Sequence, residues 1–158
     1  MVRFAEEKDI PRINELRRQV SELHAAGRPD IFKPGFCQEL RDRAYTLLRG
    51  EESDILVAER DGAICGMAAI EYLHKPESPY CHPRNVYYVT EFGVDEAYQR
   101  RGVGRELIDF MEADARARGF SGIELDMWTF NESAQAFYEA LGFRTYRLYM
   151  ERDLKEEA

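Results

Sequence analysis

The stretch 98-YQRRGVGREL-107 decides how the rest of the chain is interpreted. It places three arginines and two glycines where a strand ending at Val94 gives way to an amphipathic helix of about residues 102–118. The first N–H groups of a helix have no partner within the helix and carry about half a positive charge, so a helix start attracts anions. Glycine lets a ligand approach the bare backbone. The stretch therefore predicts a turn that binds a phosphate or pyrophosphate.

Two other phosphate-binding patterns do not fit this turn. No Gly-Lys-Ser/Thr occurs in the chain, which excludes a P-loop. Gly102 and Gly104 are followed by Leu107 rather than a third glycine, so the dinucleotide-binding pattern is not matched. A tight strand-to-helix turn with solvated arginines remains an alternative at this point.

Length and composition indicate a single globular domain over residues 1–158, with 44% hydrophobic residues to form a core. The net charge of −8 and the pI near 5.0 argue against a general nucleic-acid binder, which needs a basic face. The three cysteines are far apart and form no CxxC pair, which favours reduced thiols in a cytoplasmic protein. The charged segment 1–10 does not resemble a signal peptide, and no apolar run is long enough for a membrane span. The three histidines have no metal-site spacing, so no metal is expected.

Hydrophobic periodicity predicts strands alternating with helices in one mixed sheet, an α/β arrangement. The helices are expected at about 9–27, 34–49, 102–118 and 132–141. The strands are expected at 2–5, 54–60, 63–73, 85–94, 122–128 and 143–154. The pair Asp61-Gly62 between two of these strands predicts a tight hairpin.

Two motifs resemble the GNAT superfamily of acyl-CoA-dependent N-acyltransferases. The first is Gln99-x-x-Gly102-x-Gly104 after a strand ending in valine, which is similar to the family signature [QR]-x-x-G-x-[GA]. The second is 131-NESAQAFYEALGF-143, which resembles the family's N-x-x-A-x-x-x-Y-x-x-x-G-F segment. The resemblance spans essentially the whole chain. It implies a single α/β domain with a mixed, mostly antiparallel sheet of six to seven strands flanked by about four helices.

The resemblance also implies roles for individual residues. Acetyl-CoA would be the co-substrate, with its pyrophosphate on the backbone amides of Gln99, Arg100, Arg101, Gly102, Val103, Gly104 and Arg105. Phe92 and Val94 would pair with the pantetheine arm and the acyl carbonyl. Asn131 would hydrogen-bond the pantetheine. Tyr138 would stand near the sulfur as general acid.

Elementary chemistry agrees with these roles. Acyl transfer from a thioester to an amine needs a neutral amine, a stabilised oxyanion and an acid for the departing thiolate. An alkylammonium titrates near about 10.4, so its proton must be accepted by some group at neutral pH. A phenol with a pKa near about 10 can share a proton with a thiolate of pKa about 8.5.

Glu91 lies within the apolar strand 86-VYYVTEFGV-94 and is the candidate base or amine anchor. A surface or salt-bridged glutamate is the alternative, and an ordered water chain could replace a single base. Glu71, Glu124 and Asp126 are weaker candidates.

The sequence does not identify the acceptor amine. The variable segments 24–36 and 74–84, with aromatics such as Tyr72, Tyr80, Tyr87 and Trp128, are candidates for the acceptor side. The expected activity is direct acetyl transfer from acetyl-CoA to a primary amine of a small molecule or peptide. The alternative is a non-catalytic acyl-CoA-binding regulatory module on the same fold. Neither nucleic acid nor membrane is an expected partner, and the resemblance leaves a homodimer open.

Overall fold

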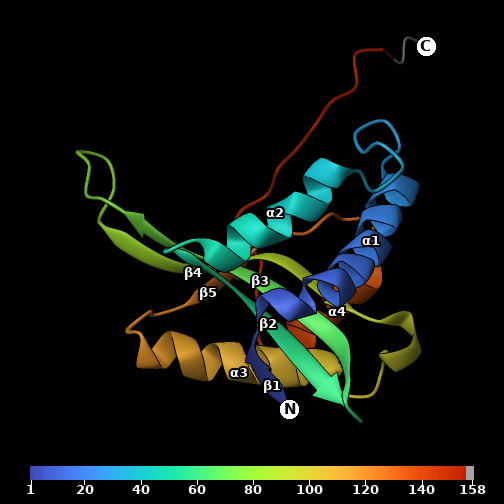
Figure 1. The fold of residues 1–158 in the computed structure, drawn as a ribbon. Helices are drawn as coiled ribbons and strands as arrows, with labels where there is room; N and C mark the ends of the chain where they lie inside the picture. Colours follow the sequence, from blue (N-terminus) through green and yellow to red (C-terminus); the bar gives the residue numbers. More distant parts are fainter. Residues whose placement is uncertain (156–158) are drawn as a thin grey trace. The chain divides into compact units, whose positions relative to one another are not determined.

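The computed structural model describes residues 1–155 in two compact units, Met1–Asp126 and a second unit that begins at Met127. The first unit holds three α-helices, two short 3₁₀ turns and every strand of the sheet (Figure 1). Its elements are β1 (Val2–Phe4), η1 (Glu7–Asp9), α1 (Ile10–Gly27), α2 (Gln38–Arg49), β2 (Ser53–Arg60), β3 (Ala63–Lys75), β4 (Arg84–Val94), η2 (Glu96–Tyr98), α3 (Val103–Ala117) and β5 (Ile123–Leu125).

The sheet has the order β1-β2-β3-β4-β5, with antiparallel ladders except for the parallel pair of β4 and β5. The β2–β3 hairpin turns at Asp61 and Gly62, whose φ angles are 53° and 77°. Positive φ at both central residues is the geometry that an Asp-Gly pair favours, so this predicted hairpin is confirmed.

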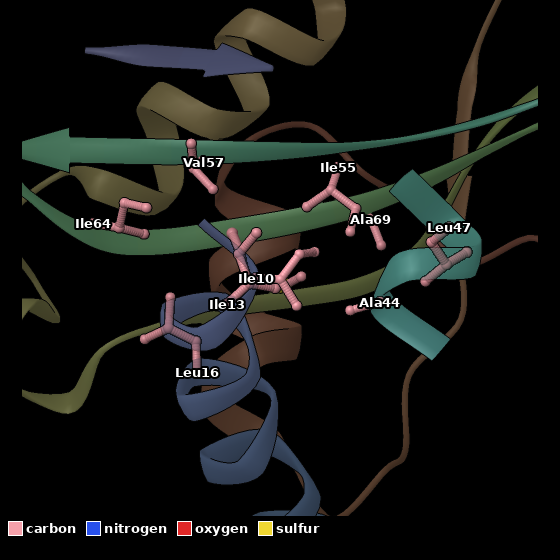
Figure 2. Packing of buried hydrophobic residues seen from close by; sticks show 10 residues of the cluster. Ile10, Ile13, Leu16, Ala44, Leu47, Ile55, Val57, Ile64 and Ala69 are labelled. Carbon is pink, nitrogen blue, oxygen red and sulfur yellow. The ribbon is translucent and has the colours of Figure 1, made fainter. Parts of the chain in front are cut away.

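Helices α1 and α2 cover one face of the sheet and α3 covers the other (Figure 1). Figure 2 shows the core beneath α1 and α2, where the helix side chains point at β2 and β3. The helix side contributes Ile10, Ile13, Leu16, Ala44 and Leu47, and the sheet side contributes Ile55, Val57, Ile64, Met67 and Ala69. The helix positions repeat every three or four residues, which is the spacing of an amphipathic helix that packs one face against a sheet.

The mixed, mostly antiparallel α/β fold with four helices is confirmed, but the expected six to seven strands are five in residues 1–155. The predicted strand at 143–154 is wrong, since the structure assigns no strand there. A strand needs a neighbour for its backbone hydrogen bonds, and the described part of the second unit holds no other strand. The alternating apolar side chains of this segment, Tyr146, Leu148 and Met150, are exposed at 66%, 75% and 91%.

Helix α2 begins at Gln38 rather than near Pro34. Gly35 has a φ of 92°, which is incompatible with a right-handed helix, so the helix can begin only beyond it. Strand β5 is likewise shorter than the expected 122–128, because only Ile123–Leu125 find partners on β4.

The second unit contains α4 (Glu132–Ala140). Asn131 caps its start by accepting a hydrogen bond from the Ala134 amide at 3.2 Å. Its end is marked by Gly142 with a φ of 93°, while the Phe143 amide donates to the Tyr138 carbonyl at 3.0 Å. This pairing is typical of a glycine-terminated helix. None of the helices described in residues 1–155 has an apolar stretch sufficient to traverse a bilayer.

Candidate active site

The turn between β4 and α3 is held by side chains of the first unit. The Asp95 carboxylate accepts a hydrogen bond from the Ala97 amide at 2.9 Å. It also forms an ion pair with Arg12 of α1. Arg12 also donates from Nε to the Ile64 carbonyl of β3 at 2.9 Å. These contacts lower the pKa of Asp95, first through the Ala97 amide and then through Arg12. The turn is thereby fixed to α1 and β3 by the protein itself.

Two residues of this turn have a left-handed backbone, Arg100 with φ 61° and Gly102 with φ 82°. Glycine adopts this conformation without strain, whereas an L side chain adopts it at a cost. The first helical hydrogen bond of α3 runs from the Glu106 amide to the Gly102 carbonyl at 3.0 Å. Gly102 therefore both turns the chain and begins the helix.

The amides of Val103, Gly104 and Arg105 precede the first bonded amide of α3. Within the described residues, no protein acceptor lies in hydrogen-bonding geometry with these three N–H groups. Such groups at a helix start can bind an anionic oxygen. This part of the turn can therefore hold a phosphate through the backbone.

Arginine side chains border the same turn. Arg100, Arg101 and Arg105 are all exposed. The Arg101 guanidinium lies 5.4 Å from the centre of the Tyr98 ring, and Gln99 donates from Nε2 to the Val94 carbonyl at 3.4 Å. The arginines supply positive charge beside the amides without being committed to buried ion pairs.

Glycines in the sheet bring two helices close to the end of β4. A β-carbon on Gly66 of β3 would lie 2.8 Å from Cγ1 of Val103, and one on Gly93 would lie 2.9 Å from Cγ2 of Val20. Gly66 pairs with Val94 in the ladder. Helix α3 therefore begins over Gly66, next to the last residue of β4, and α1 packs against the opposite face.

Strand β4 extends beyond the residues that pair with β5. The parallel pairing covers Tyr87, Tyr88 and Val89 and ends there, whereas β4 continues to Val94. The segment 90–94, with Phe92 and Val94, thus extends past β5 while it remains paired with β3 on the other side. An extended ligand can pair with backbone groups at such an edge.

Glu91 is salt-bridged to Arg17 of α1. Arg17 donates from Nε to Oε2 at 2.6 Å and from Nη2 to Oε1 at 3.0 Å. The Arg17 side chain is 5% exposed and the Glu91 side chain 25%. The alternative that Glu91 is a salt-bridged glutamate is therefore present in the structure, although the carboxylate keeps access to solvent.

Asn131 and Tyr138 lie in the second unit, with Asn131 at the start of α4 and Tyr138 within the helix. Asn131 uses Oδ1 as the helix cap and also accepts from the Ser133 hydroxyl at 3.3 Å. The Tyr138 ring packs edge-on against Phe137 and Phe143, with centroids 5.1 and 5.5 Å away. Burial raises the pKa of the Tyr138 phenol above its ordinary value.

Two of the aromatic residues expected on the acceptor side lie in the protein interior. Tyr87 is fully buried and Tyr72 is 5% exposed. Tyr87 donates to Asp114 at 2.9 Å and Tyr72 donates to Asp54 at 2.7 Å, and both rings pack against Phe120. Tyr87 thus joins the sheet to α3, Tyr72 bonds within the sheet, and neither ring is exposed enough to contact an acceptor.

The weaker acidic candidates each have a partner. Glu71 lies 3.7 Å from Arg43, and Glu124 pairs with Arg84 at 3.3 Å. Asp126 accepts from the Tyr88 hydroxyl at 2.5 Å. Residues 1–155 contain no group of three or more His, Cys, Asp or Glu side chains that could hold a metal ion.

Sequence reasoning missed Arg17, Gly66 and Gly93. Arg17 carried a signal, because it follows Ile13 and Leu16 on the apolar stripe of α1, where a charge requires a partner. The two glycines carried none, since the distance between a helix and a sheet is not encoded in either segment alone.

Comparison with known proteins supports the same interpretation. Residues 13–143 match the model of the Acetyltransferase (GNAT) family. A mutant of the BH1408 protein from Bacillus halodurans superposes with a TM-score of 0.94 at 30% identity, covering 98% of this chain and 99% of that chain. The N-alpha-acetyltransferase RimI of Mycobacterium tuberculosis is 37% identical over 91 residues, which is 55% of this chain and 49% of that protein.

A more distant structure shares the fold. The aminoglycoside N-acetyltransferase AAC(6')-Iy, solved in complex with CoA, gives a TM-score of 0.76 at 20% identity and covers 98% of this chain and 94% of that one. At this identity the likeness shows the fold alone. The chain spans about half the length of the first curated relatives it matches.

Proposed function

The chain belongs to the Acetyltransferase (GNAT) family, and on that premise we propose that it transfers the acetyl group of acetyl-CoA directly to a primary amine of a small molecule or peptide. The observation that carries the proposal is the start of α3, where the amides of Val103, Gly104 and Arg105 have no protein acceptor within residues 1–155 and lie next to the part of β4 that extends past its ladder with β5. An anionic group and an extended arm can bind side by side there. An acyl-CoA has both.

In this proposal the pyrophosphate binds the backbone from Gln99 to Arg105. The left-handed Gly102 turns the chain so that successive amides point the same way. Arg100, Arg101 and Arg105 add positive charge for the phosphate oxygens. The bare backbone is the main binding group, and the arginines strengthen it.

The pantetheine arm would then lie along β4 beyond the β5 ladder. Phe92 and Val94 supply main-chain groups for it, as a strand edge does for an added strand. Asn131 caps the helix with its Oδ1 atom, so its Nδ2 group can donate to a pantetheine carbonyl.

Tyr138 acts as the general acid in this mechanism. The amine attacks the thioester carbonyl, a backbone N–H at the end of β4 stabilises the oxyanion, and the C–S bond breaks as the thiolate takes a proton. Burial raises the pKa of Tyr138, so the phenol is protonated at neutral pH and can donate. The amine loses its proton to Glu91 or through water to solvent.

Two named relatives suggest which amines to test first. One structural neighbour is an aminoglycoside N-acetyltransferase, and one sequence relative is an N-alpha-acetyltransferase. We therefore choose kanamycin and a peptide with a free N-terminal alanine as probes, together with spermidine as a simple polyamine.

The thiols of Cys37, Cys65 and Cys81 are free, which fits a reducing compartment and a cytoplasmic protein.

The deciding experiment follows free thiol while the protein is incubated with acetyl-CoA and each probe. Release that depends on a particular amine, and that is lost in Tyr138→Phe with acetyl-CoA affinity retained, supports the transferase. Tight binding of acetyl-CoA with no amine-dependent release would instead indicate the non-catalytic acyl-CoA-binding module. Unchanged acetyl-CoA affinity in Gly102→Val would contradict the placement of the pyrophosphate.

A further inference from the structure

We propose that Arg17 is a positioning residue for the acceptor side of the site: it holds the Glu91 carboxylate in one orientation beside the open end of β4. This inference rests on the proposed transferase function. The inference extends that function by naming a residue, Arg17, through which α1 and the loop that follows α1 would control the reaction.

A β-bulge directs Glu91 to the face where Arg17 lies. Along β4, Glu91 pairs with Ala69 and Val89 pairs with Ile70, so Thr90 is an extra residue in the ladder. Tyr87 reaches Asp114 of α3, and a regular strand would put a residue four positions later on that same face. The bulge reverses the alternation, and Glu91 meets α1 on the opposite face.

The Arg17 guanidinium is fixed on every side. Besides its two bonds to Glu91, Nη1 donates to Asn14 Oδ1 at 2.9 Å and to the Leu40 carbonyl. Its central carbon lies 5.4 Å from the centre of the Phe36 ring. A planar guanidinium committed to this many partners has little freedom to rotate.

These partners connect the carboxylate with the segment before α2. Phe36 precedes α2, and the Arg41 guanidinium lies over the same ring at 5.3 Å. Leu40 belongs to the first turn of α2. Arg17 therefore joins α1, the segment before α2, α2 and β4 at one point.

The pair retains the ability to accept a proton or a hydrogen bond. Each Glu91 oxygen accepts one N–H from Arg17, and a carboxylate oxygen can accept a second donor. The Glu91 side chain is 25% exposed whereas Arg17 is 5% exposed. The amine or its water would thus meet Glu91, while Arg17 acts only from behind it.

The test compares kcat and KM in Arg17→Lys, Arg17→Gln, Glu91→Gln and the double variant Arg17→Gln/Glu91→Gln, with whichever of kanamycin, spermidine and the alanine peptide the wild type acetylates. Lysine keeps the charge but not the two-pronged geometry, so we expect kcat to fall about tenfold to a hundredfold in both Arg17 variants. The KM for acetyl-CoA should stay within about twofold, because its binding turn is not altered. The double variant should be no slower than Glu91→Gln alone.

Arg18→Gln is the matched control, because Arg18 is the next residue on α1 and, among the described residues, forms an ion pair with exposed Glu22 alone. It should leave kcat and both KM values unchanged. If Arg17→Gln alone unfolds, the double variant still decides the matter, since it removes the unpaired charge together with its partner.

Three results would overturn the inference. One is a fully active Arg17→Lys variant, and another is a double variant whose loss is the product of the two single losses. The third is a loss that follows the acetyl-CoA KM rather than kcat. Absence of thiol release from the wild type with all three amines is a different failure, because it removes the proposed function itself.

Discussion

Gly66 of β3 lies directly under Val103 of α3, so that a β-carbon at residue 66 would come within 2.8 Å of Val103 Cγ1. Leu107 Cδ1 would lie 3.2 Å away. The absence of a side chain at Gly66 therefore determines the distance between the sheet and the start of α3, which carries the unpaired amides.

Gly66→Ala should consequently destabilise the protein. Val103 is β-branched and stiff in a helix, so it cannot turn aside, and overpacking of this kind costs about 1–3 kcal/mol. Combining the change with Val103→Ala should recover part of the loss, and urea unfolding measures both. Gly122→Ala is the matched control, because nothing lies within 4 Å of a β-carbon there and stability should hardly change.

The two left-handed residues of the turn should respond differently to substitution. Gly102→Ala places a side chain at φ 82° and should cost about 1–2 kcal/mol, although the nearest atom to the added β-carbon, Arg60 Nη2, would lie at an ordinary contact distance of 3.8 Å. Arg100→Gly relieves the same strain at φ 61°, offset by the greater freedom of glycine when unfolded, and should change stability by less than about 1 kcal/mol. Equal destabilisation by the two changes would contradict the backbone geometry.

Acid should weaken the fold through Asp9. Arg3 donates to both Asp9 oxygens at 2.8 and 3.1 Å, the Glu6 amide adds a bond at 2.8 Å, and the pKa of Asp9 is lowered mainly by Arg3. A lowered carboxyl pKa stabilises the fold fully above its unfolded value of about 3.8 and loses that contribution as the pH falls through the folded pKa.

Asp9→Asn tests this assignment. The variant should lose about 2 kcal/mol at pH 7, because it replaces charge-assisted hydrogen bonds at a buried site. Urea midpoints at pH 7 and pH 3 should then differ less in the variant than in the wild type. An unchanged difference would assign the acid sensitivity to other carboxylates, such as Asp95.

Tyr138→Phe should lower kcat by a factor on the order of 10² while leaving the acetyl-CoA KM nearly unchanged. Since burial raises the pKa of the phenol, it keeps its proton at alkaline pH, and the wild-type kcat should not decline through its ionisation up to about pH 10. A kcat profile from pH 7 to 10 checks both statements. Tyr146→Phe, at a tyrosine 66% exposed in the same unit, is the control.

The segment 143–154 gives a direct comparison between pattern and structure. Because the structure assigns it no strand, its amides should exchange with solvent much faster than those of the buried strand residues Ile55 to Ala58. Hydrogen exchange followed by mass spectrometry measures this. Slow exchange throughout the segment would restore the strand that the alternating sequence predicts.

Most helices and strands could be predicted because their signals are local. The stripe of α3, the Asp61-Gly62 turn and the Asn131 cap each specify their element within a few residues. The start of α2 and the last strand were misjudged. In those places the outcome depended on a glycine conformation at residue 35 and on whether a neighbouring strand was present.

The candidate cofactor site was predicted for the same reason. Its binding groups are consecutive amides, so the order Gln99-x-x-Gly102-x-Gly104 is enough to form them once a helix follows. The family membership confirmed by residues 13–143 follows from these contiguous motifs. The roles of the individual residues remain predictions that the experiments above test.

The sequence by itself determined the local elements, the glycine turn and the family, because each is written in contiguous residues. Only the tertiary structure decided which side chains and elements from distant parts of the chain contact each other. The partner of Glu91 lies 74 positions away in the chain, and a single bulged residue, Thr90, turns Glu91 toward it. Gly66 and Gly93 set how closely α3 and α1 approach the end of β4. Such relations depend on the packing of distant segments, for which no local pattern exists.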